Sequence, residues 1–145
     1  MTDYELIRKQ AEALADGTLW DITLYANISA LLYESLTEIN WAGFYIMRDG
    51  DLILGPFQGK PACTRIPVGK GVCGTAVQEN RIIRVDDVHA FPGHIACDSA
   101  SASEIVLPIH KDGEIVGVLD IDSPICGRFS KDDEKGLQEI VKVIE

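Results

Sequence analysis

Residues 104–122 read EIVLPIHKDGEIVGVLDID, two alternating apolar runs on either side of an Asp-Gly turn. Period-two alternation around such a turn predicts an antiparallel β-hairpin. We expect its strands over residues 104–110 and 114–122. Because successive side chains point to opposite faces, a one-residue error in pairing would move every apolar side chain to the wrong side of the sheet.

The turn admits two registers, which differ in how they sort apolar and acidic side chains. A two-residue turn at Asp112 and Gly113 would pair Ile105 with Asp120 and mix both kinds on one face. A three-residue loop over residues 111–113, with Gly113 in the left-handed conformation, separates them. We therefore predict the pairs His110 with Glu114, Val106 with Val118, and Glu104 with Asp120.

The predicted hairpin has one core face and one acidic face. The core face carries Ile105, Leu107, Ile109, Ile115, Leu119 and Ile121. The other gathers Glu104, Asp120 and Asp122 near one end, with neighbours roughly 5 to 7 Å apart. Three carboxyls this close cannot all ionise cheaply, so at least one should have a raised pKa and hold a proton near neutral pH. A solvated acidic sheet edge is the alternative.

The rest of the chain predicts helices at both ends with strands between them. Near the N-terminus, the pattern indicates a helix that opens with a capping box at Thr2 and Glu5 and ends at residues 16–17, followed by a helix over 21–38. The middle of the chain indicates a hairpin that begins at Trp41 and turns at residues 49–50, a strand over 64–68, a short helix over 72–79 and a strand over 81–85. A long loop over 86–103 precedes the hairpin of residues 104–122, and a helix extends from Ser130 to the end. This is an α+β fold: a central antiparallel β-sheet with the N- and C-terminal helices packed on one face, in a single domain over residues 1–145.

Composition limits the kinds of partner. The chain has 145 residues, 46% hydrophobic and 25% charged, which is typical of a folded globular domain. Its formal net charge of -10 would repel a phosphate backbone or an anionic membrane, so we expect neither nucleic acid nor membrane as a partner. The first residues lack a basic segment followed by an apolar one, so we expect a cytoplasmic protein.

Four cysteines in a cytoplasmic chain favour thiol or metal chemistry over structural disulfides. Zinc would need Cys63, Cys73 and Cys97 with His94 or His89. Structural zinc sites usually take ligands in close pairs, whereas these cysteines lie far apart, so we predict no metal. A Cys-x-x-Cys redox motif is also absent from the sequence.

Cys97, in the long loop, and Cys63, after the turn at residues 59–62, fit redox chemistry in which a sulfenic acid condenses to a disulfide. Cys73 and Cys126 fit better as small buried hydrophobes, and Cys126 is interpreted as a bystander. Nearby acidic groups disfavour a thiolate at Cys97, so a substrate must assist. A sulfoxide would, because protonation of its oxygen by a carboxylic acid makes its sulfur electrophilic.

Residues 69–74 read GKGVCG and match the G-x-G-x-x-G dinucleotide fingerprint. The surrounding pattern is antiparallel, with a short preceding strand and a short following helix, and so does not predict a βαβ unit. We interpret the glycines as a tight turn into the helix, whose free N–H groups are able to hold a carboxylate.

Six motifs together resemble one family, the free methionine-R-sulfoxide reductases, which are built on a GAF domain. They are WAGFY (41–45), LGPFQGKPAC (54–63), GKGVCG (69–74), HIACD (94–98), SEIV (103–106) and LDIDSP (119–124). The likeness extends over nearly the whole chain. It implies a GAF-like domain and an oxidoreductase that converts free methionine-(R)-sulfoxide to methionine.

The resemblance also implies the roles of single residues. Cys97 would attack the sulfoxide, Cys63 would resolve the sulfenic acid, and Cys73 would be an auxiliary thiol. The residues matching the family's sulfoxide-binding acids are Glu104, Asp120 and Asp122, and those matching its aromatic wall are Trp41 and Tyr45. Strand alternation independently places both aromatics on one face, with Gly43 leaving space between them.

The implied reductant is thioredoxin, recycled with NADPH, with no bound cofactor, and the family commonly forms homodimers. A different class of function remains open on the sequence alone: a GAF module that binds a small ligand or senses oxidants without turnover. A GAF fold by itself does not separate the two.

Overall fold

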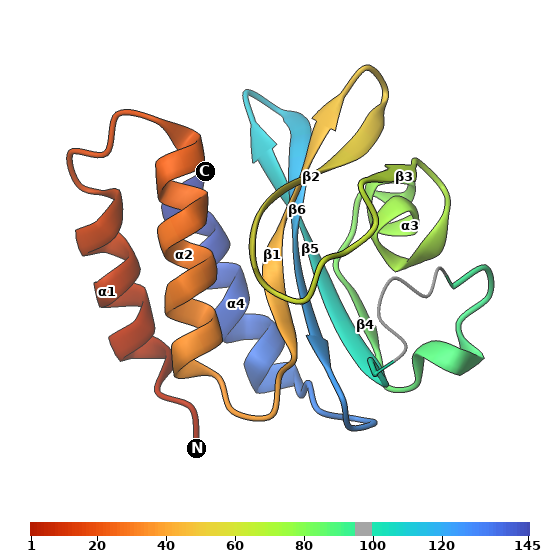
Figure 1. Ribbon diagram of the computed structural model, residues 1–145. Coiled ribbons are helices and arrows are strands. Elements are labelled where there is room, and N and C mark those ends of the chain that lie inside the picture. The colour runs from red at the N-terminus through yellow and green to blue at the C-terminus, as the bar shows by residue number, and fades with distance from the viewer. Residues whose placement is uncertain (95–99) are drawn as a thin grey trace.

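The computed structural model describes residues 1–94 and 100–145. In these residues one antiparallel sheet of six strands has the order β3-β2-β1-β6-β5-β4 (Figure 1). The strands are β1 (Trp41–Arg48), β2 (Asp51–Gly59), β3 (Arg65–Pro67), β4 (Ile83–Val85), β5 (Ser103–Lys111) and β6 (Glu114–Ser123). The helices are α1 (Tyr4–Ala15), α2 (Asp21–Ser35), α3 (Gly71–Glu79) and α4 (Lys131–Ile144), with a 3₁₀ turn η1 (Val88–Ala90) in the predicted long loop.

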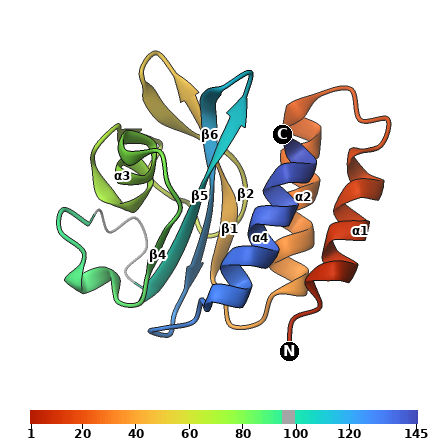
Figure 2. The ribbon, with the colours of Figure 1, turned by 180° about the vertical axis from the view of Figure 1, so that it is seen from behind.

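The two faces of the sheet carry different layers. Helices α1, α2 and α4 cover one face, and α3 lies on the other with the segments around it, as both views show (Figure 1, Figure 2). The predicted α+β architecture, with the terminal helices on one face of an antiparallel sheet, is confirmed.

Strand alternation divides the buried side chains into two cores. On β1, Ala42 and Phe44 face α1, α2 and α4 in the helix-side core, whereas Trp41 and Tyr45 face α3 in the pocket-side core. Val72, Cys73 and Ala76 of α3 complete the pocket-side core. The face predicted for the two aromatics is therefore confirmed.

The turn of the second hairpin differs from our prediction. Asp112 and Gly113 have φ angles of 54° and 79°, the two positive values of a type I′ turn, and Lys111 pairs with Glu114. The register then shifts between Ile109 and His110. A two-residue turn followed by a bulge thus achieves the separation of faces for which we expected a three-residue loop.

The bulge leaves the strand pairs two residues from the predicted register. Glu104 pairs with Asp122 rather than with Asp120, and Val106 pairs with Asp120. Outside the bulge, a two-residue shift keeps the side chains on their predicted faces and changes only their partners. Within the bulge the faces do change, because Val116 packs against the helix-side core at the place predicted for Ile115.

Gly43 also has a different role from the one predicted. A Cβ atom there would lie 2.3 Å from Cβ of Phe57 on β2, at the point where the β1–β2 register shifts. The glycine therefore lets β2 approach β1 closely, rather than leaving space between the aromatic side chains.

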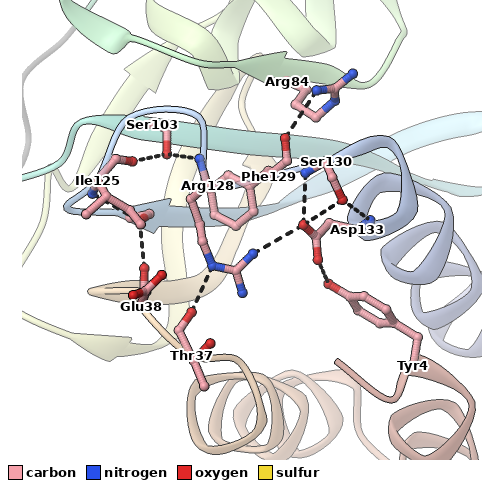
Figure 3. A network of polar contacts seen from close by, with 11 residues as sticks. Tyr4, Thr37, Glu38, Arg84, Ser103, Ile125, Arg128, Phe129, Ser130 and Asp133 are labelled. Atoms are coloured by element: carbon pink, nitrogen blue, oxygen red, sulfur yellow. Dashed lines mark hydrogen bonds and ion pairs between the residues drawn. The ribbon is translucent and has the colours of Figure 1, made fainter. Parts of the chain in front are cut away.

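The helix ends correct two further details. The side chain of Asp3, not Thr2, caps α1 by accepting from the N–H of Leu6, and α2 ends at Ser35 rather than at residue 38. The predicted start of the last helix is confirmed, since Ser130 and Asp133 form a reciprocal capping box (Figure 3). Among the described residues, no helix combines the length and apolar character needed to span a membrane.

Candidate functional site

A small buried cavity of about 40 Å³ lies between α3 and the sheet. It is lined by Trp41, Tyr45, Ala62, Ile66, Gly71, Val72, Cys73, His94, Ser101, Glu104, Asp120 and Asp122. The cavity thus collects six of the eight residues predicted for the site. Of the other two, Cys63 packs against the surrounding pocket-side core, and Cys97 lies outside the described residues.

The acidic side chains come from adjacent strands. Glu104 on β5 lies directly opposite Asp122 on β6, and Asp120 lies two residues before Asp122 on the same face. Glu104 and Asp120 are only 7% and 5% exposed, and Asp122 is half-buried with its Oδ1 atom out of contact with solvent. This burial rules out the alternative of a solvated acidic edge.

Burial is the main cause of the raised pKa of Glu104 in this cluster. It raises the pKa of Glu104 well above the usual range, and the neighbouring charges of Asp120 and Asp122 raise that pKa further. A protonated Glu104 can donate a hydrogen bond, or a proton, to an oxygen in the cavity. The prediction that at least one of the three carboxyls has a raised pKa is confirmed.

Asp120 differs from Glu104 because its neighbours partly stabilise its charge. Burial raises its pKa, whereas hydrogen bonds from Glu104, Cys73 and Asp122 lower it. Its Oδ1 atom is buried and has no hydrogen-bond partner among the described residues. A buried acceptor of this kind is costly unless a bound group donates to it, which is an arrangement typical of a ligand site.

Cys73 places a thiol against the same carboxyls. Its side chain is 3% exposed, and Sγ lies 3.9 Å from Oε2 of Glu104. Burial and the charges of Asp120 and Glu104 raise the pKa of this thiol well above its usual range. Cys73 is therefore held as a neutral thiol near neutral pH, which limits its reactivity.

The aromatic side of the cavity is built from β1. Trp41 and Tyr45 are each 2% exposed, and their ring centroids lie 5.9 Å apart. Their polar ends reach the segment after β2, where Trp41 Nε1–H donates to the carbonyl of Lys60 and the Tyr45 hydroxyl donates to the carbonyl of Cys63. Burial, followed by the charge of Asp120, raises the pKa of Tyr45, so this hydroxyl stays protonated.

The described cysteines fall into three environments. Cys63 is disulfide-bonded, Cys73 is a buried free thiol, and Cys126 is an exposed free thiol. Our interpretation of Cys126 as a buried hydrophobe is therefore wrong, because the turn after β6 leaves it in solvent. As Cys63 is disulfide-bonded, it cannot supply the thiolate of the zinc set considered from the sequence.

A different trio meets the geometric requirement for a cation. One ligand atom each from Cys73, Glu104 and Asp120 lies within 4.8 Å of the others. These are the groups that already share protons in the cavity, so a cation there would compete with the protonated form of Glu104.

Two polar cavity residues were not predicted as site residues. His94 and Ser101 line the cavity from the segment between α3 and β5. Burial and the neighbouring His89 lower the pKa of His94. His94 was considered only as a zinc ligand and as part of the HIACD motif, and Ser101 has no signal beyond its position in a long aperiodic segment, which does not show which side chains turn inward.

The glycines of GKGVCG form the predicted tight turn. The N–H of Gly69 donates to the carbonyl of Gly74, and a Cβ atom on Gly74 would lie 2.4 Å from the Pro67 carbonyl oxygen. The strand before this turn, β3, has three residues and pairs antiparallel with β2, so no dinucleotide-binding βαβ unit is present in the described residues.

The fold and site define a GAF domain, and the GAF domain family model matches residues 22–145. The free methionine-R-sulfoxide reductase of Escherichia coli is 57% identical over 142 residues, covering 98% of this chain and 86% of that protein. Two solved structures also match. The fRMsr of Staphylococcus aureus in complex with substrate has a TM-score of 0.96 and 56% identity, covering 100% of this chain and 95% of that one. The free methionine-R-sulfoxide reductase from Neisseria meningitidis in complex with its substrate has a TM-score of 0.95 and 42% identity, covering 98% of this chain and 86% of that one. The chain therefore belongs to the free methionine-R-sulfoxide reductase family of GAF-domain oxidoreductases.

Proposed function

We propose that this protein reduces free L-methionine-(R)-S-oxide to L-methionine. The observation that carries the proposal is the buried carboxyl cluster, in which Glu104 has a raised pKa beside the orphaned Oδ1 of Asp120. A sulfoxide oxygen accepts hydrogen bonds and, on protonation, makes its sulfur electrophilic, so a neutral acid is the group that this substrate requires. Relatives named for this activity are 57% and 46% identical to the chain.

In the first step, the Cys97 sulfur attacks the sulfoxide sulfur while the acid cluster protonates the oxygen. The oxygen then passes to Cys97 as a sulfenic acid, and the thioether of methionine leaves. Sulfur is oxidised at Cys97 and reduced in the substrate by the same two electrons. Glu104, Asp120 and Asp122 would bind the sulfoxide group and hold the proton.

In the second step, a thiol attacks the sulfenic acid, a disulfide forms and water leaves. We assign Cys63 as the main resolving cysteine and Cys73 as an auxiliary one that exchanges with it. Two observations support this order: Cys63 is disulfide-bonded and half-buried, whereas Cys73 is a buried free thiol whose raised pKa disfavours attack. Thioredoxin, recycled with NADPH, would restore the thiols without any cofactor bound to this chain.

We propose that the enclosed character of the cavity selects a free amino acid as substrate. Most of its lining side chains are buried, which favours a small ligand over a continuing peptide chain. Trp41 and Tyr45 would form the wall for the methyl end of the substrate. We further propose a cytoplasmic location and a homodimer, in keeping with the family resemblance.

An epimer-resolved assay tests the proposal. The purified protein is incubated with dithiothreitol and each epimer of free and N-blocked methionine sulfoxide. Turnover of the free R epimer alone is expected. Equal turnover of the blocked substrate would contradict the closed cavity, and no turnover of any substrate would favour a GAF module without catalysis.

The attacking thiol has its own matched control. Cys97→Ser should abolish reduction, whereas Cys126→Ser, which alters an exposed thiol outside the cavity, should retain it. Circular dichroism of both variants checks that the fold is kept. Activity in the Cys97→Ser protein would remove this residue from the mechanism.

A further inference from the structure

The two buried aromatic side chains of β1 also contact the segment that carries Cys63. Trp41 Nε1 lies 3.1 Å from the Lys60 carbonyl oxygen, and the Tyr45 hydroxyl lies 3.0 Å from the Cys63 carbonyl oxygen. The acceptors are three residues apart in the segment between β2 and β3. Both aromatic residues therefore line the cavity and also hold this segment with their polar ends.

These contacts are held rigidly by the packing of the rings. The Trp41 ring stacks with those of Phe57 and Tyr45, at centroid distances of 5.1 and 5.9 Å. Gly59 begins the segment at a φ of 134°, and a Cβ atom there would lie 2.6 Å from the Trp41 ring. At the other end, the N–H of Leu54 on β2 donates to the Thr64 carbonyl.

In the structure the disulfide of Cys63 also ties this segment, a bond that the reduced protein lacks. Residues 60–64 contain no helix or strand, and Lys60 and Thr64 are exposed. The two hydrogen bonds come from side chains that are 2% exposed, and they restrain the backbone on either side of residues 61–62.

We infer that Trp41 and Tyr45 are positioning residues for Cys63, and that they accelerate its condensation with the sulfenic acid by holding its backbone in place. The inference rests on the proposed function and deepens it by assigning a second role to two cavity residues. A thiol kept close to its partner reacts faster than one on an unrestrained segment, because the ordering entropy is already lost.

A single-turnover experiment separates the two chemical steps. Reduced protein is mixed with free methionine-(R)-sulfoxide without reductant, and quenched samples are analysed for methionine, for the dimedone-trapped sulfenic acid and for the disulfide. Tyr45→Phe keeps the ring and removes one donor, and Trp41→Phe removes the other. Each should slow disulfide formation about fivefold relative to methionine formation, the size expected for one hydrogen bond, with a matching rise in the dimedone adduct.

The ratio of the two rates distinguishes positioning from a general loss of structure, which would slow both steps together. Tyr33→Phe makes the same chemical change at a tyrosine that is 41% exposed and should leave the ratio unchanged. If wild-type protein forms no methionine, the proposed function fails. If it forms methionine and both variants resolve the sulfenic acid at the wild-type ratio, only this inference is overturned.

Discussion

Glu104 in the cavity and Asp133 in the helix layer are equally inaccessible to solvent, but their pKa values are shifted in opposite directions. Glu104 and Asp133 are each 7% exposed. Burial and neighbouring acids raise the pKa of Glu104, whereas hydrogen bonds from Ser130 and Tyr4, with the charge of Arg128, lower the pKa of Asp133 against its own burial. Burial alone therefore does not determine the charge of a carboxyl in this protein.

The partners of Asp133 are all donors. It accepts from the Tyr4 hydroxyl at 2.6 Å, from the Ser130 N–H at 2.8 Å and from Arg128 Nη1 at 3.2 Å (Figure 3). The hydrogen bonds of Asp133 therefore stabilise its charged form. They also connect α1 and the turn before α4 to α4 itself. The cavity carboxyls face other acids and a thiol, so they are satisfied only when protons or a ligand are present.

The largest effect on stability is expected for Asp133→Asn. The change removes the charge that the guanidinium of Arg128 faces, and it weakens the capping box with Ser130, so the free energy of unfolding should fall by about 3 kcal/mol. Urea denaturation measures this. Asp132→Asn, one residue earlier and exposed, is the matched control and should change stability little. Equal stabilities of the two variants would mean that the donors around Asp133 contribute nothing beyond solvation.

Glu104→Gln should have the opposite effect on stability and a large effect on activity. Since folding raises the pKa of Glu104, its contribution to stability is fully present below its unfolded pKa of about 4.5 and is lost as pH rises through the folded value. The amide avoids this loss, so the variant should become progressively more stable than wild type as pH rises above about 5. Reduction should fall about 100-fold or more, because the proton donor is gone.

Urea denaturation at several pH values, paired with the epimer-resolved assay, checks both halves of this prediction. Gln138→Glu, on α4 away from the cavity, reverses the chemical change as a control and should leave the activity intact. A Glu104→Gln protein that is less stable than wild type at neutral pH would show that the cavity carboxyls are a structural network like that of Asp133.

The alternation of side chains between the two faces of a strand explains how much of this site could be predicted from the sequence. Alternation along residues 104–122 fixes which side chains share a face, so the grouping of Glu104, Asp120 and Asp122 was predicted correctly. Alternation is unchanged by a two-residue shift, so it could not select Asp122 over Asp120 as the partner of Glu104. That choice depends on the bulge at Val116, which the sequence pattern does not mark.

Contacts between distant elements were inaccessible for a different reason. Cys73 approaches Glu104 only because α3 packs on the sheet, and Tyr4 approaches Asp133 across 129 residues of sequence. The local periodicity of the sequence predicts neither the contact between Cys73 and Glu104 nor the contact between Tyr4 and Asp133. The capping role of Ser130 was predicted because an N-cap is local, whereas the donors that lower the pKa of Asp133 come partly from another helix.

The smallest effect is expected for Tyr4→Phe, which removes a single donor from Asp133 and keeps the ring that packs beside Gly136. A hydrogen bond to a charged group contributes about 1.5 kcal/mol, so this loss of stability should be about half that of Asp133→Asn. Folding lowers the pKa of Asp133, so its contribution is present above its unfolded pKa of about 3.8 and is lost as pH falls through the folded value.

Without the tyrosine hydroxyl, the loss of folding stability as pH falls should become smaller. Urea denaturation between about pH 2 and pH 5 measures this loss. Tyr33→Phe is the control for the same atom at an exposed site. The rate of methionine sulfoxide reduction should not change, because Tyr4 lies in the helix layer on the other face of the sheet from the cavity (Figure 1). A fall in that rate at a temperature where the variant remains folded would show that the two acidic regions are coupled through the sheet.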